Sequence, residues 1–255
     1  MALSGTPSDQ LPAVLATGAT DIRMIFVSMA ARERDGRDAA YLEWHSLDHR
    51  PEQHRLAGLR QSLRVVSTPA CRAARACSGP HYDAVDHVMT YFFAEGAALD
   101  QFKVLSGALG GDRRPFRLPS VQSAYFRLAG KVANPRAIAG ADVIPWRPAQ
   151  GIYLIVERGA ASPAGLSEID GIAGIWWHEG GAPPAPDFPD TAGIQVTYCF
   201  LDDDPVVTAG RLRAPLEQRW ASGRVVPLLA APFHTIVPFE WDRFLPDTDD
   251  PPSAG

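Results

Sequence analysis

Short apolar runs and amphipathic segments alternate along the first half of the chain. The apolar runs have the length of strands and are rich in β-branched and aromatic residues. Two longer segments repeat apolar residues at helical spacing, and the second of them ends at a Gly-Gly pair. The intervening residues 68–82 are predicted to form a polar loop. The predicted order is β, α, β, β, α, β, with strands at 23–29, 59–67, 88–93 and 123–128 and helices at 36–49 and 98–109.

The first predicted helix carries an apolar stripe and meets a proline near its end. Ala40, Trp44 and Leu47 follow one another at i, i+4 and i+7, which places them on one helix face. A proline disfavours the helical conformation at the residue before it and lacks an amide donor. Because residue 51 is proline, we expect the helix to end or bend near His49 and Arg50.

The second half repeats this order with unequal lengths. Residues 169–172 resemble 56–59, and residues 196–200 resemble 88–93. The early copy places a full helix between its first two strands, whereas the late copy has only residues 159–167 there. We therefore expect one working pocket per chain. The elements predicted for the second half are strands at 152–156, 196–200 and 233–241 and a helix at 206–220 that is interrupted by Pro215.

The repeated order predicts an α+β protein made of two ferredoxin-like βαββαβ halves. Three prolines between residues 130 and 150 indicate a connector between the halves. Both ends of the chain are rich in Pro, Ser, Asp and Gly, as frayed tails are. The predicted divisions are a tail at 1–21, a first half at 22–130, a connector at 131–150, a shortened second half at 151–243 and a tail at 244–255.

Composition and charge limit the partners of the protein. The 255 residues are 46% hydrophobic and 21% charged, which is ordinary for a globular chain. The net charge is −5 and the basic residues are scattered, so the chain lacks the footprint of a nucleic-acid-binding protein. Three cysteines cannot complete a disulfide framework, and no apolar run approaches the ~20 residues of a membrane span. We expect a cytoplasmic protein that binds a small molecule and neither nucleic acid nor membrane; a homodimer is compatible with the sequence.

The end of the first helix holds the residues best suited to chemistry. Histidine exchanges its proton near neutral pH, and three of the seven histidines lie between residues 45 and 54. Helical rotation places Tyr41, Trp44, His45 and Asp48 on one side, whereas the proline leaves the direction of His49 open. One interpretation makes His45 or His49 a general acid or base beside a pocket lined by Tyr41 and Trp44.

Two further features bear on that interpretation. Asp48 or Glu52 could orient the active histidine. The alternative is structural: Trp44 belongs to the core, the two carboxylates pair with Arg50 or Arg55, and the histidines form a polar helix end.

Other polar residues could complete the site. His81 and His87 flank the entry to the third strand beside Asp83 and Asp86, and one of them could complete a His/Asp relay with His49. Loop histidines are more often solvated. The residues predicted to bind substrate are Tyr41, Trp44, Arg60, Arg64, His87 and Tyr91. Tyr91 would shape the pocket. Arg60 and Arg64 lie on one strand face where they could hold a carboxylate, although salt bridges are the default for arginines.

Cofactor signals are weak. His45 and His49 have HxxxH spacing, but the Glu of HExxH and a third ligand are missing, so we predict no metal. His178 and His234 are lone histidines in apolar settings; such residues are usually core, and the alternative is axial ligation of haem. The sequence has no Gly-rich phosphate loop, dinucleotide fingerprint or GxSxG elbow.

The run Tyr41-Leu-x-Trp44-x-x-x-x-His49-x-Pro51, followed by a Gly58-Leu59 turn, resembles the first helix of EthD-type members of the dimeric α/β-barrel superfamily. The resemblance implies two four-stranded antiparallel sheets that face each other across a barrel, with a small-molecule pocket between each sheet and its helices. Here one chain would supply both sheets. Because this sequence has an additional histidine, His45, the resemblance leaves open whether His45 or His49 has the role of the histidine in the EthD-type motif.

The superfamily contains cofactor-free monooxygenases, cyclases, isomerases and lyases of aromatic or polyketide-like compounds, and haem enzymes related to chlorite dismutase. The resemblance therefore implies a cofactor-independent enzyme in which His49 or His45 moves a proton, Asp48 orients it, and Trp44 and Tyr91 shape the pocket. Fold does not settle function. The alternatives are a haem protein that uses His178 or His234 and a non-catalytic accessory protein that binds a small molecule.

Overall fold

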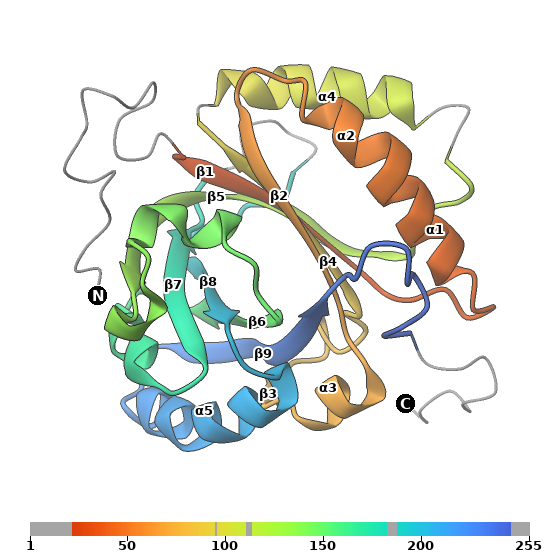
Figure 1. The fold of residues 1–255 in the computed structure, drawn as a ribbon. Helices are drawn as coiled ribbons and strands as arrows, with labels where there is room; N and C mark the ends of the chain where they lie inside the picture. The colour runs from red at the N-terminus through yellow and green to blue at the C-terminus, as the bar shows by residue number, and fades with distance from the viewer. Residues whose placement is uncertain (1–21, 95, 111–113, 183–187, 246–255) are drawn as a thin grey trace.

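The chain folds into a closed antiparallel β-barrel with its helices on the outside (Figure 1). The computed structural model describes residues 22–94, 96–110, 114–182 and 188–245. The predicted N-terminal tail at 1–21 lies outside the described residues, as does all of the predicted C-terminal tail at 244–255 except its first two residues. The strands are β1 (Met24–Ala30), β2 (Leu59–Val66), β3 (Cys77–Ser78), β4 (His87–Phe93), β5 (Ser120–Ala133), β6 (Gly151–Arg158), β7 (Ile172–Glu179), β8 (Ile194–Leu201) and β9 (Val226–Thr235).

Two strand pairings between the halves close the barrel. The strand order of the sheet is β2-β4-β1-β5-β7-β8-β6-β9-β3, and β2 also pairs with β9. At one seam β5 runs antiparallel to β7, where Val132 lies opposite Ile175. At the other seam Val66 of β2 lies opposite His234 of β9. The order β2-β4-β1-β5 in the first half matches β7-β8-β6-β9 in the second, element for element along the chain.

Alternation along the strands divides the apolar residues between the barrel interior and its outer faces. In β1, Ile25 and Val27 point into the barrel core, which also holds Phe92 and Trp176. Thr90 and Tyr198, one from each half, are joined across the interior by a 2.7 Å hydrogen bond. The outward residues of the first half form a separate cluster with the helix that covers them. This cluster consists of Leu59, Met89, Tyr91, Phe93, Ala98, Leu99, Phe102 and Tyr125.

Helices cover both outer faces, and they do so unequally. On the second half, the outward residues pack against a single long helix, where Leu212 and Leu216 are fully buried. Between β6 and β7 there is only a short 3-10 helix, Ala164–Glu168. The helices are α1 (Asp38–Trp44), a π-helix η2 (His45–His49), α2 (Arg50–Gln53), α3 (Pro69–Ala73), α4 (Ala97–Leu109), η3 (Pro135–Ala137), η4 (Ala141–Trp146), η5 (Ala164–Glu168) and α5 (Pro205–Ala221).

Several sequence-based expectations need correction. The first helix does not end before Pro51 but passes through a π-turn and continues to Gln53. Residues 68–82 are not all loop, because Thr68 caps α3 and β3 follows it. α5 runs through Pro215 without interruption, held by its buried apolar face. The last strand is β9 at 226–235 rather than 233–241, and β5 extends beyond the expected end at 128.

Among the helices of the described ranges, none has both the length and the apolar character needed to span a membrane.

Candidate functional site

A cavity of about 370 Å³ opens between the outer face of strands β2, β4, β1 and β5 and the helices above it. Outward positions of the strands form its floor, because residues that alternate with the barrel-core residues must face the helices. Thus Phe26 and Ser28 face the cavity, whereas Ile25 and Val27 face the barrel core. The lining residues are Phe26, Ser28, Ala30, Tyr41, His45, His49, Gln53, Arg64, Met89, Tyr91, Phe102, Lys103, Ser106, Arg114, Arg117, Leu118, Ser120, Ser123, Tyr125 and Phe188.

A π-turn brings both predicted histidines to this cavity. The backbone amide of Arg50 donates to the carbonyl of His45, a bond five residues long in place of the usual four. In a regular α-helix the ring of Pro51 would clash with the carbonyl of Leu47. The wider turn relieves that clash, and it leaves the rings of His45 and His49 side by side with centroids 5.4 Å apart.

His45 is the more deeply placed of the two histidines. Its Nε2 lies 3.2 Å from the hydroxyl of Tyr91, and its Nδ1 is buried without a hydrogen-bond partner. Burial lowers the pKa of His45 well below its ordinary value, and the positive charge of Arg64 lowers it further. Burial also raises the pKa of Tyr91. At neutral pH this pair therefore consists of a neutral imidazole and a protonated phenol.

His49 lies on the same wall in a different electrostatic setting. Its ring stacks on Trp44 at a centroid distance of 4.8 Å, and its Nδ1 is also buried without a partner. Burial is the main cause that lowers the pKa of His49 to about 4, with Arg114 acting in the same direction and Asp48 opposing it. His49 is thus also neutral near pH 7, and Asp48 is close enough to favour its protonated form.

Aromatic rings make up the floor and far wall. Phe26 and Tyr125 have ring centroids 4.8 Å apart, Tyr91 and Phe102 are 4.7 Å apart, and Tyr125 and Phe188 are 4.7 Å apart. Sequence reasoning found Tyr91 but missed the other four rings. The signal for Phe26 was the placement of Ser28 two residues later in an otherwise apolar strand, which marks the face that is not barrel core.

Of the two arginines predicted to hold a carboxylate, the structure brings only Arg64 to the cavity. A register shift between Leu59 and Gln61 leaves Arg60 out of the β2–β4 pairing, which breaks the alternation that would have placed both arginines on one face. Arg60 donates to the carbonyl of Ala57 at the start of the strand. Arg64 is 5% exposed, and its guanidinium lies over the ring of Tyr41 at 5.2 Å.

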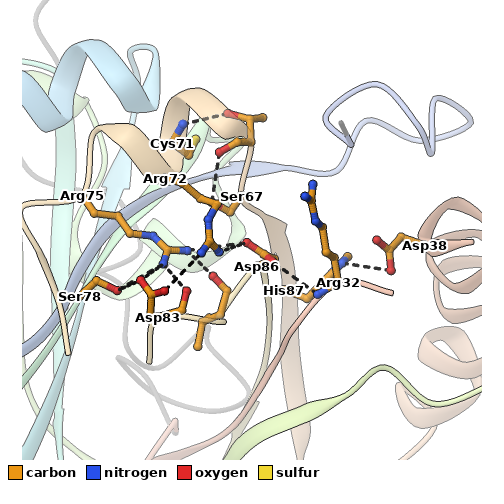
Figure 2. A network of polar contacts seen from close by, with 12 residues as sticks. Arg32, Asp38, Ser67, Cys71, Arg72, Arg75, Ser78, Asp83, Asp86 and His87 are labelled. Atoms are coloured by element: carbon orange, nitrogen blue, oxygen red, sulfur yellow. Dashed lines mark hydrogen bonds and ion pairs between the residues drawn. The ribbon is translucent and has the colours of Figure 1, made fainter. Parts of the chain in front are cut away.

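The residues flanking β4 belong to a different polar network (Figure 2). The Nε2 of His87 lies 3.6 Å from Oδ1 of Asp38, and both side chains are buried. Its neighbour Asp86 accepts a 2.6 Å hydrogen bond from Arg72. His81 is exposed, with its Nε2 3.3 Å from Oε1 of Gln122. Neither His81 nor His87 lines the cavity, so the predicted relay with His49 is not formed, and His87 does not reach the place predicted for substrate.

Trp44 and Asp48 lie beside the cavity rather than in its lining. The ring of Trp44 packs against the rings of both His45 and His49. Gln53, which sequence reasoning did not single out, lines the cavity and donates a 2.6 Å hydrogen bond to the hydroxyl of Ser106. This bond ties α2 to α4 over the site.

The surroundings of His178 and His234 do not fit haem. His178 is 0% exposed in the barrel core, where its ring meets Tyr198 edge-on, so a porphyrin could not reach it without repacking the interior. His234 is covered by Phe244, whose ring stacks on it with a centroid distance of 4.3 Å and an interplanar angle of 5°. Within the described part of the chain, no three His, Cys, Asp or Glu side chains gather as a metal site.

Comparison with known proteins gives similarity at the level of structure. No protein-family model matches the sequence, and no curated protein matches it significantly. A protein named as a chlorite dismutase is similar over 88% of this chain and 99% of its own, with 10% identity and a TM-score of 0.54.

Two further structures are similar to about the same degree. A protein named as a monooxygenase from Fusobacterium nucleatum subsp. nucleatum is 6% identical over 85% of this chain and 93% of its own, with a TM-score of 0.50. An anthrone oxidase-like protein is 12% identical over 86% of this chain and 93% of its own, also with a TM-score of 0.50. At these identities the likeness concerns architecture alone: the chain has the fold of the dimeric α/β-barrel proteins.

Proposed function

We propose that this chain is a cofactor-independent enzyme that moves a proton on a small aromatic, oxygenated compound bound in the cavity. The observation that carries the proposal is the pair of buried, neutral histidines, His45 and His49, on one wall of an aromatic-lined pocket. Buried polar atoms are nearly always hydrogen-bonded, so two orphaned Nδ1 atoms at one site favour a functional explanation. A volume near 370 Å³ suits a small organic ligand.

His49 is the better candidate for the base, with His45 as a positioned second group. A neutral imidazole can accept a proton, and Asp48 favours the protonated form of His49. His45 is instead tied to the sheet through the hydroxyl of Tyr91. In the proposed step the proton moves from an acidic C–H or O–H of the substrate to the imidazole, and the electron pair stays on the substrate as an enolate or phenolate.

The residues around the histidines have supporting roles in this proposal. The stack of Trp44 on His49 fixes the plane of the imidazole, and Tyr41 stacks on His45 at 5.9 Å. The aromatic floor of Phe26, Tyr91 and Tyr125 offers faces for a flat ring system. The substrate class agrees with the name of one structural neighbour, an anthrone oxidase-like protein.

We further propose that the two halves are copies of one ferredoxin-like βαββαβ unit, as in a tandem EthD-like protein. The support is the strand order, β2-β4-β1-β5 and β7-β8-β6-β9, which repeats element for element. In this view the second copy lost its first helix to the short η5, and its outer face was filled by α5. The first half would then retain the working site.

Exchange of carbon-bound hydrogen tests the proton transfer directly. Anthrone carries acidic C–H bonds next to an aromatic ring system, and NMR in D₂O under nitrogen follows their replacement by deuterium. We expect the wild-type protein to accelerate the exchange, His49→Gln to lower the rate at least ~10-fold, and the His45→Gln/His49→Gln double variant to abolish the acceleration.

His81→Gln is the matched control, because it makes the same substitution at an exposed histidine outside the cavity. It should keep the wild-type exchange rate. Exchange that is equally fast in the wild-type protein and in the folded double variant overturns the proposal, and so does wild-type protein that gives no acceleration over buffer.

A further inference from the structure

The charged residues that line the cavity all carry one sign. Four cationic side chains reach it, Arg64, Lys103, Arg114 and Arg117, and the described lining contains no aspartate or glutamate. Arg117 is exposed, while Lys103 and Arg114 are half-buried, so water screens these three. Arg64 differs, because it is 5% exposed and lies on the floor of the cavity.

Arg64 is a buried cation without a carboxylate partner among the described residues. Its Nε is buried with no hydrogen-bond partner, and its guanidinium lies over the ring of Tyr41 at 5.2 Å. Two other arginines with largely buried side chains do have carboxylate partners: the side chain of Arg219 forms a 2.9 Å ion pair with the buried Glu157, and that of Arg75 lies 3.8 Å from Asp86. Because burying an unpaired charge is costly, Arg64 stands as an exception that needs an explanation.

The titratable neighbours of Arg64 do not supply the missing negative charge. Burial and Arg64 itself lower the pKa of His45, and burial raises the pKa of Tyr91, so both are uncharged near neutral pH. His49 is neutral as well, and Arg50 and Arg114 add positive charge nearby. No described residue therefore supplies a counter-charge to Arg64, and an anionic molecule in the cavity would supply it.

We infer that the cavity takes its aromatic ligand as a monoanion, with a planar carboxylate or an equally delocalised oxyanion paired to the guanidinium of Arg64. The planar fork of arginine matches the two oxygens of a carboxylate. The ring system then lies on Phe26, Tyr91 and Tyr125, and the anion approaches the histidine wall. This inference names the substrate class of the site proposed above, and it rests on that proposal only in using the same cavity.

Binding of two isosteric probes tests the inference without any turnover. 2-Naphthoate and 2-naphthamide have the same rings and nearly the same shape, and only the first is an anion at pH 7.5. Isothermal titration calorimetry should give the wild-type protein at least ~10-fold tighter binding of 2-naphthoate, the value expected for one charged hydrogen-bonded contact. Arg64→Met should reduce the preference to about twofold or less, and Arg64→Lys should keep part of it.

Arg60→Met is the matched control, because this arginine lies on the same strand but outside the cavity. It should keep the wild-type preference. Equal affinity of the two probes for the wild-type protein overturns the inference, as does failure of 2-naphthoate to bind, and neither result depends on whether an Arg64 variant folds. A folded Arg64→Met protein that retains the full preference also overturns it.

The two proposals fail in different experiments. Suppose that binding prefers the anionic probe because of Arg64, but the protein does not accelerate deuterium exchange in anthrone over buffer. This result supports the anionic ligand and overturns the proton transfer. Exchange that depends on His49, with equal affinity for the two naphthalene probes, supports the proton transfer and overturns the anionic ligand.

Discussion

The hydroxyl of Tyr91 on β4 lies 3.2 Å from Nε2 of His45 on the π-helix, and both side chains are 3% exposed. The contact joins residues 46 positions apart in sequence, so it fixes the helix end against the sheet. Because the other ring nitrogen of His45 has no protein partner, this bond alone sets the hydrogen-bonding state of the imidazole.

Tyr91→Phe should therefore cost stability while leaving the cavity shape in place. The substitution keeps the ring but leaves Nε2 of His45 buried without a partner, which costs about 1–3 kcal/mol in the free energy of unfolding. Urea denaturation at pH 7.5 measures the loss. Tyr41→Phe is the control, since Tyr41 is half-buried and its expected change is within about 0.5 kcal/mol. Equal stabilities of the two variants would show that the bond contributes nothing.

The stability of the protein should fall as the pH drops from about 6.5 towards 4. Burial lowers the pKa of His49 to about 4 in the folded state, so the unfolded chain binds the proton more readily throughout this range. Between pH 7 and pH 5 the wild-type protein should lose about 2 kcal/mol of unfolding free energy more than His49→Gln does. Urea denaturation at pH 7, 6 and 5 gives, for each of the two proteins, the slope of the unfolding free energy against pH.

His178, whose pKa burial lowers to about 3, acts in the same direction but is present in both proteins and cancels from the difference. His81→Gln should keep the wild-type slope because the residue is exposed. Parallel slopes for the wild-type protein and His49→Gln would contradict the neutral, buried state assigned to His49.

Strands β1, β2 and β4 could be predicted closely from sequence because each is an apolar run with a clear boundary, whereas β5 is longer than its apolar run and the two-residue β3 lies in a polar segment. The weaker predictions share a physical cause, which is proline inside a regular element. β9 contains Pro227 and Pro232, and proline argues against a strand in propensity-based prediction. The pairing register of β6 and β9 shifts beside Pro227. Pro215 similarly suggested a break in α5 that the buried leucines of that helix override.

The histidine-bearing helix end was found from sequence, but its geometry was not. Residue spacing indicates which residues share a face only while the helix stays regular, and the π-turn at His45–His49 changes that face. The prediction that Arg60 and Arg64 share a strand face missed a bulge for the same reason. The unpaired charge of Arg64 depends on residues brought from distant parts of the chain, so no local pattern reveals it.

Gly151→Ala should destabilise the barrel. A Cβ at this position, near the seam of the two halves, would lie 2.1 Å from the carbonyl oxygen of Phe233, which is backbone and cannot swing away. We expect a loss of about 1–3 kcal/mol in the free energy of unfolding, measured by urea denaturation. Gly210→Ala is the control, because Gly210 lies exposed in α5 with open space around its Cβ position, and it should gain about 0.5–1 kcal/mol. A neutral Gly151→Ala would mean that β6 and β9 pair less closely than described.

Pro51→Ala tests whether the proline holds the π-turn. Alanine restores an amide donor and removes the ring that would clash with the carbonyl of Leu47, so a regular α-helix becomes accessible. A crystal structure of the variant should show the amide of Arg50 bonded to the carbonyl of Ser46 instead of His45. His45 and His49 would still share a face of the regular helix, but the angle between their side chains about the helix axis would change. Anthrone exchange should therefore slow although the unfolding free energy changes by only about 1 kcal/mol. If the π-turn persists, the packing of Trp44 against the two imidazoles holds it, and the histidine pair is a property of the aromatic cluster rather than of the proline.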